Sequence, residues 1–311
     1  MTEISIIIPI FNEGLNINYL YKSLLKNIPV KLDYEIIFVD DCSSDNSLEL
    51  LNKIKNKNKK IKILSFQKNY GQSTALHCGI TNATGKYVIT MDGDLQNDPI
   101  DIKNFYTTIK SSDLDCVIGW RKNRSEKSIL RVFVSKIANK LIKKILKTNI
   151  NDLGCTFKCF KREIFSQIIW ATDFHRYFSA FIINEGFKIK EIEVKHNDRM
   201  AGESKYGYSR IFNVVVDILF LYFVFNSLNK PLHFFGKFAL ILLSFSFISS
   251  IIAIYLKVFD IRKFTDTPLP ELIIFLSLSS LIILFFGILA ELILSLYFHL
   301  KQKRNYIVKN N

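Results

Sequence analysis

Two long runs without a charged residue restrict the architecture of this chain more than any other feature. Residues 238–256 and 272–290 are each nineteen residues long and contain no Asp, Glu, Lys or Arg. At a rise of about 1.5 Å per residue, a helix of that length covers roughly 30 Å, the thickness of the hydrocarbon core of a bilayer. The runs therefore predict two transmembrane helices, in preference to a buried helical hairpin in a soluble protein.

The charges beside these runs predict their orientation. Residues 257–271, between the runs, hold three basic and three acidic residues, whereas residues 301–309 hold four basic and no acidic ones. Because cytoplasmic segments are enriched in Lys and Arg, we expect both termini in the cytoplasm and the short loop outside.

The sequence before the runs is less apolar and divides at about residue 207. Residues 208–229 are largely apolar but include Asn213 and Asp217, which favours an interfacial amphipathic helix. The expected organisation is a cytoplasmic domain (1–207), an interfacial segment (208–235), a transmembrane helix (236–257), an external loop (258–271), a second transmembrane helix (272–298) and a basic cytoplasmic tail (299–311).

The first ninety residues alternate short apolar runs with segments of helical periodicity. Strands are expected at 4–10, 35–39, 61–66 and 88–91, with helices between them at 15–27, 47–54 and 73–81. Such alternation is typical of a parallel sheet covered by helices. The predicted fold class is α/β, with a doubly wound, mostly parallel sheet that binds ligands at its carboxyl edge.

The strand expected at 88–91 is followed by Asp92-Gly93-Asp94-Leu95-Gln96. Residues two apart on an extended chain share a face, so Asp92, Asp94 and Gln96 are expected to point the same way. Three oxygen-bearing side chains suit Mg²⁺ or Mn²⁺, although a surface turn with incidental acids also explains the triplet. Asp40 and Asp41 follow a neighbouring strand, and an acidic crevice of this kind admits a nucleoside diphosphate only together with a cation.

Two common nucleotide-binding motifs are missing from the sequence. A dinucleotide-binding domain requires Gly-x-Gly-x-x-Gly after its first strand, where this chain has Pro9-Ile10-Phe11-Asn12-Glu13-Gly14, and no Walker-type loop is present. A mononucleotide diphosphate held by acids and a metal remains open.

Positive charge is concentrated in one segment of the chain. The formal net charge is +14, and residues 121–147 hold ten Lys or Arg against a single acid, Glu126. Residues 128–147 have one apolar face, which predicts a basic helix that grips lipid phosphate and anionic headgroups or is merely a solvated cationic face. A nucleic-acid binder would not need the acidic crevice, so we expect no nucleic-acid partner.

Several motifs, in order along nearly the whole chain, resemble a known family. They are Ile8-Pro9-Ile10-Phe11-Asn12-Glu13, Val39-Asp40-Asp41-Cys42-Ser43-Ser44-Asp45, Asn69-Tyr70-Gly71-Gln72, Asp92-Gly93-Asp94-Leu95-Gln96-Asn97-Asp98-Pro99, Asn151-Asp152-Leu153-Gly154-Cys155 and Gly202-Glu203-Ser204-Lys205-Tyr206. They resemble glycosyltransferase family 2, and more narrowly the polyprenyl-phosphate glycosyltransferases related to dolichol-phosphate mannose synthase. Bacterial undecaprenyl-phosphate glucosyl- and aminoarabinose-transferases look most similar. Cys42 departs from the Gly that is usual in the family.

The resemblance implies a glycosyltransferase A-type domain with a nucleotide-sugar donor, a polyprenyl phosphate acceptor, a Mg²⁺ or Mn²⁺ cofactor and a place in the bacterial inner membrane. It implies a donor pocket of Pro9, Phe11, Glu13, Asp41 and Asp92, and metal ligands Asp92, Asp94 and Gln96. It further implies that Arg121 and Arg131 hold donor or acceptor phosphates and, with Asp94, belong to the catalytic residues. It also implies that Arg199, Ser204 and Lys205 meet the lipid phosphate. The charges of the cluster Arg121, Arg124 and Arg131 by themselves suit anionic oxygens, so Arg124 and Arg131 are also expected at the lipid phosphate.

Asp152 stands where the family has its proposed catalytic base. An acceptor phosphate monoester has a second pKa of about 6, so it is mostly a dianion at neutral pH and needs little deprotonation. We therefore expect Asp152 to orient groups or to stabilise developing oxocarbenium charge, with a helix or turn cap as the structural alternative.

These expectations combine into one reaction: inverting, metal-dependent transfer of a sugar from a nucleotide sugar to polyprenyl phosphate at the inner leaflet, for cell-envelope use. UDP is the preferred nucleotide by resemblance only, and the sequence does not name the sugar. A processive polysaccharide synthase would carry Gln-x-x-Arg-Trp, and neither Trp120 nor Trp170 stands in that motif. The other alternative is a catalytically dead membrane scaffold.

The interfacial and membrane helices also offer packing faces for a homo-oligomer.

Overall fold

The computed structural model describes residues 2–122, 143–144, 148–166, 174–195, 197, 209–227 and 230–301. It divides into two compact units, Met1–Ile218 and Leu219–Asn311. The predicted basic helix at 128–147 lies almost wholly outside the described residues.

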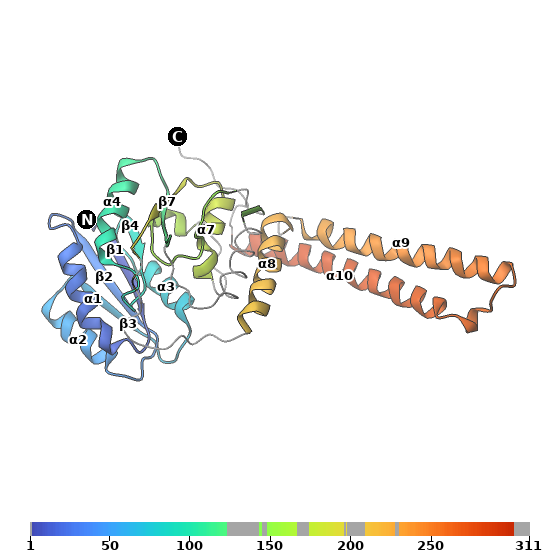
Figure 1. Ribbon diagram of the computed structural model, residues 1–311, viewed down its shortest axis with the longest axis horizontal. Helices are drawn as coiled ribbons and strands as arrows, with labels where there is room; N and C mark the ends of the chain where they lie inside the picture. The colour runs from blue at the N-terminus through green and yellow to red at the C-terminus, as the bar shows by residue number, and fades with distance from the viewer. Residues whose placement is uncertain are drawn as a thin grey trace. The chain divides into compact units, whose positions relative to one another are not determined.

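A seven-stranded sheet forms the centre of the first unit, with the strand order β3-β2-β1-β4-β6-β5-β7 (Figure 1). Every neighbouring pair is parallel except the two made by β6, which is antiparallel to β4 and to β5. The predicted α/β class with a mostly parallel sheet is therefore confirmed. The strands are β1 (Ile4–Ile10), β2 (Tyr34–Asp40), β3 (Ile61–Ser65), β4 (Tyr87–Thr90), β5 (Cys116–Trp120), β6 (Lys158–Lys161) and β7 (Ile189–Glu193).

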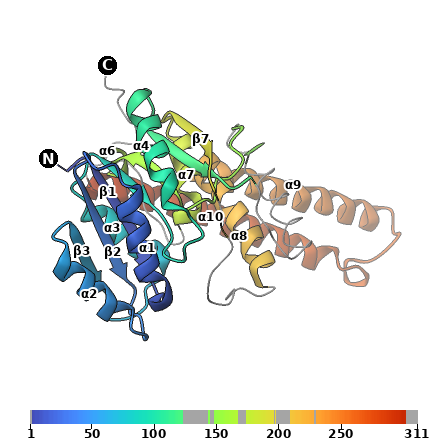
Figure 2. The same ribbon diagram turned by 60° about the vertical axis from the view of Figure 1, so that its left-hand side comes forward.

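Helices cover both faces of this sheet. They are α1 (Gly14–Asn27), α2 (Ser47–Lys57), α3 (Gln72–Thr81), the 3₁₀ turn η1 (Pro99–Asp101), α4 (Ile102–Ser111), α6 (Arg162–Phe165) and α7 (Phe174–Asn184). The ring of Phe160 on β6 packs on Phe178 of α7 at 4.7 Å, while Phe157 packs on Phe105 of α4 at 4.5 Å. Because side chains alternate along extended chain, α4 and α7 lie on opposite faces (Figure 2).

The strands have the composition that a doubly covered sheet requires. All of β4 is buried, as are nearly every residue of β1 and every residue of β2 after its first two. β-Branched residues make up most of β1 and β4 and three of the five buried residues of β2, as is typical of central strands with helices on both faces. The sheet therefore forms the core of the unit, and the polar site residues lie at the ends of its strands.

Beyond residue 98 the sequence pattern predicts helices to about Lys110 and at 162–170, and strands at 116–119 and 187–194. It predicts neither β6 nor α7. β6 has only four residues and carries Lys158 and Lys161 at its ends, so no apolar run marks it as a strand. β6 lies between β4 and β5 and pairs with both of them. Its backbone partners are therefore far away in the sequence. Helix α7 is the second unexpected element.

Helix α8 (Ser209–Ser227) crosses the boundary between the two units, and Val216, Leu219 and Phe220 on it are exposed. The spacing of these three places apolar side chains together on the helix surface. An interfacial location for α8 stays a prediction.

The second unit contains an antiparallel pair of long helices, α9 (Pro231–Val258) and α10 (Leu269–Lys301), joined by a loop with the 3₁₀ turn η2 (Phe264–Asp266). Both are long and apolar enough to cross a membrane, with mean hydropathies of 2.4 and 2.8, and most of their side chains are exposed. The two predicted transmembrane segments, 236–257 and 272–298, lie within α9 and α10. Their exact limits stay predictions.

Polar and small residues join α9 to α10. The hydroxyls of Ser246 and Ser277 lie 2.8 Å apart, and Ser280 Oγ donates to the carbonyl of Ala239 at 2.7 Å. A carboxylate oxygen of Glu291 accepts a hydrogen bond from the backbone N–H of Leu232, in the first turn of α9, at 3.3 Å. Such contacts allow close packing between helices that are both apolar.

Candidate active site

The carboxyl ends of β1, β2, β4 and β5 carry most of the predicted site residues that the structure describes. The loop after β1 holds Phe11 and Glu13, Asp41 follows β2, Asp92 and Asp94 follow β4, and Arg121 follows β5. Parallel strands place these ends at one edge of the sheet, so the structure brings the residues to the same side.

Hydrogen bonds tie the loop after β1 to the loop after β2. The backbone N–H of Gly14 donates to Asp45 at 2.9 Å, and the backbone N–H of Glu13 donates to Ser47 Oγ at 2.9 Å. Burial would raise the pKa of Asp45, but its hydrogen bonds from Ser47 and Gly14 outweigh burial and lower it. A Cβ on Gly14 would lie 2.0 Å from Asn46 Oδ1 and 2.9 Å from Asp45 Oδ2, so a larger residue would displace these side chains. These bonds hold the loops after β1 and β2 together, and their role in a donor pocket stays a prediction.

Asp41 is 3% exposed and holds the loop before α3. Its two carboxylate oxygens accept the backbone N–H groups of Tyr70 at 2.7 Å and Gly71 at 2.8 Å. Gly71 has φ +88°, a left-handed conformation that glycine adopts without strain. The contacts observed for Asp41 are therefore structural, and its role in a donor pocket stays a prediction.

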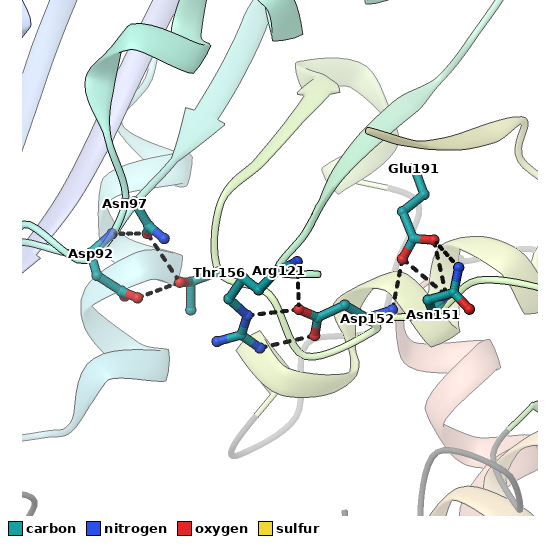
Figure 3. Close-up of polar contacts among 7 residues, drawn as sticks. All are labelled: Asp92, Asn97, Arg121, Asn151, Asp152, Thr156 and Glu191. Atoms are coloured by element: carbon teal, nitrogen blue, oxygen red, sulfur yellow. Dashed lines mark hydrogen bonds and ion pairs between the residues drawn. The ribbon is translucent and has the colours of Figure 1, made fainter. Parts of the chain in front are cut away.

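Asp92 is held on both of its carboxylate oxygens. Gln72 Nε2 donates to Oδ1 at 2.7 Å. Figure 3 shows the other two bonds, in which Thr156 Oγ1 donates to Oδ2 and the backbone N–H of Asp92 donates to Asn97 Oδ1 at 3.0 Å. Thr156 is fixed in turn, because its carbonyl accepts a 2.6 Å bond from Thr90. The sequence did not single out Gln72, Asn97 and Thr156 for this role.

The chain after β4 turns, so the expectation of an extended Asp92–Gln96 segment is wrong. Leu95 has φ +64°, and Asp94 Oδ1 accepts the backbone N–H of Gln96 at 3.1 Å. This local side-chain-to-backbone bond replaces strand pairing. A Cβ on Gly93 would lie 2.7 Å from Ile10 Cδ1, so the turn needs glycine.

The electrostatics of the acidic pair fit a divalent cation. Burial, together with the charge of Asp94, raises the pKa of the Asp92 carboxyl to about 6, although Thr156 and Arg121 oppose the shift. Among the described residues, no group of three or more His, Cys, Asp or Glu is placed to hold a metal. Mg²⁺ commonly binds one or two carboxylates and completes its shell with substrate phosphates and water, so two carboxylates are enough in number, and the role of Asp92 and Asp94 as ligands stays a prediction.

Arg121 and Asp152 form a two-point ion pair beside the acids. Arg121 Nε and one terminal nitrogen donate to the two Asp152 oxygens at 2.7 and 2.9 Å, and the backbone N–H of Arg121 donates at 3.3 Å. The side chains are only 13% and 15% exposed. Burial alone would lower the pKa of Arg121, but hydrogen bonding to Asp152 leaves it raised, so the guanidinium stays charged. Figure 3 shows this guanidinium between Thr156, which holds Asp92, and Asp152.

The turn that carries Asp152 is held by Glu191 of β7. The Glu191 carboxylate accepts the backbone N–H of Asp152 at 2.7 Å and both the backbone and side-chain N–H groups of Asn151 at 2.9 Å. Glu191 is one of several charged residues that alternate with apolar ones on β7, and no local signal distinguishes it from its neighbours.

Five predicted phosphate-binding residues lie outside the described part of the chain: Arg124, Arg131, Arg199, Ser204 and Lys205. Their roles stay predictions, as do those of the described residues.

Comparison with known proteins identifies the family. Residues 5–169 match the family described as glycosyl transferase family 2. The chain is 35% identical to a dodecaprenyl-phosphate galacturonate synthase of Rhizobium johnstonii over 99% of this chain and 92% of that protein. It is 31% identical to the undecaprenyl-phosphate 4-deoxy-4-formamido-L-arabinose transferase of Proteus mirabilis, over 70% of this chain and 67% of that protein.

A solved structure supports the fold independently. Glucosyl-3-phosphoglycerate synthase from Mycobacterium tuberculosis, in complex with Mn²⁺, UDP-glucose and phosphoglyceric acid, superposes with a TM-score of 0.54 at 14% identity, over 71% of this chain and 80% of that one. At that identity the likeness concerns the fold alone. The resemblance drawn from the motifs is confirmed by the family match and by the relatives. The chain is a glycosyltransferase and belongs to glycosyl transferase family 2.

Proposed function

We propose that this chain transfers a sugar from a UDP-linked donor to a polyprenyl phosphate, with inversion at the anomeric carbon and with a divalent metal. The relatives support the acceptor class, because the Rhizobium protein is named for dodecaprenyl phosphate and the Proteus protein for undecaprenyl phosphate. The bound Mn²⁺ and UDP-glucose of the Mycobacterium structure favour a metal and a uridine nucleotide on this fold.

The observation that carries the proposal is the position of Arg121. One buried guanidinium lies beside the acidic pair Asp92–Asp94 and is bound at two points by Asp152. A metal held by the carboxylates would bind the diphosphate of the donor. The oriented guanidinium of Arg121 would bind an oxygen of a donor or acceptor phosphate. Donor and acceptor phosphates would then meet at one edge of the sheet.

On the donor side, Pro9, Phe11, Glu13 and Asp41 would form the base and ribose pocket, with Asp92 at the ribose or the metal. Asp94 and Gln96 would be further metal ligands. When bound, the metal would stabilise the negative charge of the departing nucleoside diphosphate. The loop bonds around Asp41 and Gly14 would keep this pocket in shape before the donor arrives.

On the acceptor side, an oxygen of the lipid phosphate would attack the anomeric carbon opposite the leaving group. The new carbon–oxygen bond forms as the bond to the diphosphate oxygen breaks, and the bonding electrons leave with UDP. Arg121, Arg124 and Arg131 would bind phosphate oxygens, and Arg199, Ser204 and Lys205 would hold the lipid phosphate near the membrane. Asp152 would hold Arg121 in place, and no proton transfer to Asp152 is required.

The two apolar helices would anchor the enzyme in the bacterial inner membrane. With both termini and the first unit in the cytoplasm, the acceptor phosphate of the inner leaflet would be within reach of the site. The product, a polyprenyl-phosphate sugar, would serve cell-envelope glycosylation.

The test uses the full chain in membranes, undecaprenyl phosphate and a panel of labelled nucleotide sugars that includes UDP-galacturonate and UDP-glucose. We expect a lipid-linked sugar with one donor, an inverted anomeric configuration by NMR, loss of transfer in EDTA and recovery with Mn²⁺ or Mg²⁺. Full activity in EDTA would remove the metal from the proposal. Transfer to no lipid acceptor, with hydrolysis or a polysaccharide as the only product, would overturn it.

A further inference from the structure

Glu191 binds the turn that carries Asp152 through three N–H groups. The backbone N–H of Asp152 donates to Oε1 at 2.7 Å, and the side-chain amide of Asn151 donates to Oε2 at 2.9 Å. The backbone N–H of Asn151 is shared between the two oxygens at 2.9 and 3.0 Å. Both oxygens of the carboxylate are therefore occupied by donors of a single turn (Figure 3).

The strands that carry Glu191 and Arg121 are direct neighbours. β7 pairs in parallel with β5, and Glu191 stands opposite Ile118, three residues before Arg121. The sheet thus fixes the spacing between Glu191 and Arg121. The turn at Asp152 is held at two places: Glu191 accepts its backbone N–H, and Arg121 donates to its carboxylate.

The turn itself lies outside regular secondary structure. The carbonyl of Asp152 accepts the backbone N–H of Cys155 at 3.5 Å, which is long for a hydrogen bond, and Lys143 donates to the Asn151 side chain at 2.9 Å. The backbone hydrogen bonds from Asn151 and Asp152 to Glu191, at 2.9 and 2.7 Å, are shorter than the bond from Cys155. Their acceptor is a carboxylate, and hydrogen bonds to a charged acceptor are stronger than those to a carbonyl.

We propose that Glu191 is a positioning residue for the Arg121–Asp152 pair. It touches neither donor nor acceptor, and it acts by holding the Asp152 turn at the distance at which the Asp152 carboxylate meets Arg121 at two points. The proposal rests on the proposed function, in which Arg121 binds phosphate oxygens. A carboxylate is needed because Gln would offer one acceptor oxygen and would turn an NH₂ group towards N–H donors.

Glu193 provides a matched control on the same strand. It lies two residues further on, on the same face of β7, and pairs with Lys122 at 3.3 Å with both side chains more than half exposed. Glu191→Gln and Glu193→Gln remove the same charge from the same strand face, and only the first affects the Asp152 turn.

The experiment compares sugar transfer by the full chain in membranes. For Glu191→Gln we expect kcat to fall by about 10- to 100-fold, the scale of a small misplacement of reacting groups. The KM for the donor should stay within about threefold, because ground-state binding is retained. Glu193→Gln should stay within about twofold of wild type in both constants. In an Asp152→Asn background, Glu191→Gln should cause no further loss, since it acts through Asp152.

Two results would overturn the proposal: turnover by Glu191→Gln within about twofold of wild type, or an equal loss in the Asp152→Asn background. Hydrogen–deuterium exchange gives a readout that needs no activity. The amides of Asn151 and Asp152 should be protected in wild type and should exchange faster in Glu191→Gln but not in Glu193→Gln. Unprotected amides in wild type would overturn the proposal even if Glu191→Gln did not fold. If wild type transferred no sugar, the proposed function would fail while this exchange measurement would still decide the positioning of the turn.

Discussion

The side-chain amide of Gln72 donates a 2.7 Å hydrogen bond to the Asp92 carboxylate and so ties the start of α3 to the end of β4. The residue before it, Gly71, is held by Asp41 through its backbone N–H. Asp41, Gln72 and Asp92 are therefore connected by hydrogen bonds, from the end of β2 through the start of α3 to the residue that follows Met91 after β4.

Gln72→Leu removes this bond while keeping a side chain of similar size. We expect the donor KM, and the Mn²⁺ concentration for half-maximal activity, to rise about 10-fold, because a hydrogen bond to a charged group is lost. Steady-state kinetics with varied donor and metal measure both quantities. Gln67→Leu, at an exposed position of the same loop, is the control. Equal values for wild type and Gln72→Leu would mean that Asp92 does not contact donor or metal.

Asp152→Asn leaves Arg121 facing a neutral amide. We expect turnover to fall by about 10- to 100-fold at every pH, because the guanidinium loses its orienting partner. Turnover measured from pH 6 to 9 checks this, with Asp113→Asn as a control at an exposed ion pair with Lys188. Recovery at high pH would favour a catalytic base at residue 152 and contradict the role proposed for it.

Glu35 makes stability depend on pH at the amino edge of the sheet. Its carboxylate accepts Ser5 Oγ at 2.5 Å and the backbone N–H and hydroxyl of Thr84 at 2.6 and 2.8 Å. Burial would raise the pKa of Glu35, but these hydrogen bonds outweigh burial and lower it. The stabilisation is therefore complete above the ordinary pKa of Glu, and it is lost as the pH falls through that value towards the lowered pKa.

Glu35→Gln should lower the free energy of unfolding at pH 7 by about 1–2 kcal/mol, since the donors of Ser5 and Thr84 lose a charged acceptor. The difference from wild type should shrink below about pH 4.5, where the unfolded state takes up the proton. Thermal unfolding of the full chain in detergent at several pH values measures this. Glu49→Gln, at an exposed pair with Lys53, should be nearly neutral. A difference that stays constant with pH would exclude the charge as its source.

Gly287 sets the contact between the two apolar helices. A Cβ at this position would lie 3.0 Å from Phe235 Cβ and 3.4 Å from Leu232 Cα, whereas a Cβ on Gly236 would have no neighbour within 4 Å. Gly287→Leu should destabilise the helix pair by about 1–3 kcal/mol through overpacking. Gly236→Leu should be neutral or stabilising by up to about 1 kcal/mol, because Leu is a better helix former than Gly. Thermal unfolding of both variants in detergent decides between them, and equal melting temperatures would contradict the observed packing.

Local patterns were enough to predict much of this fold. The apolar runs of β1, β2 and β4 and the helical periodicity between them predicted a parallel sheet, because side-chain period and strand ends are properties of neighbouring residues. The uncharged runs at 238–256 and 272–290 predicted long apolar helices for the same reason.

Other features depend on residues that are far apart in the sequence. β6 exists because β4 and β5 leave room for it, and a four-residue segment with two lysines carries no strand signal of its own. The extended chain expected at Asp92–Gln96 turned instead, since Asp94 bonds to the backbone of Gln96.

The sequence by itself determined the class of fold, the family and the acidic residues at the strand ends, because each is encoded in short stretches of chain. Only the tertiary structure decided how those residues are held. Asp152 meets Arg121 across 31 residues, and Glu191 reaches the Asp152 turn across 39. Such contacts form only when the sheet brings β5, β6 and β7 side by side, and a pattern of neighbouring residues does not contain that information.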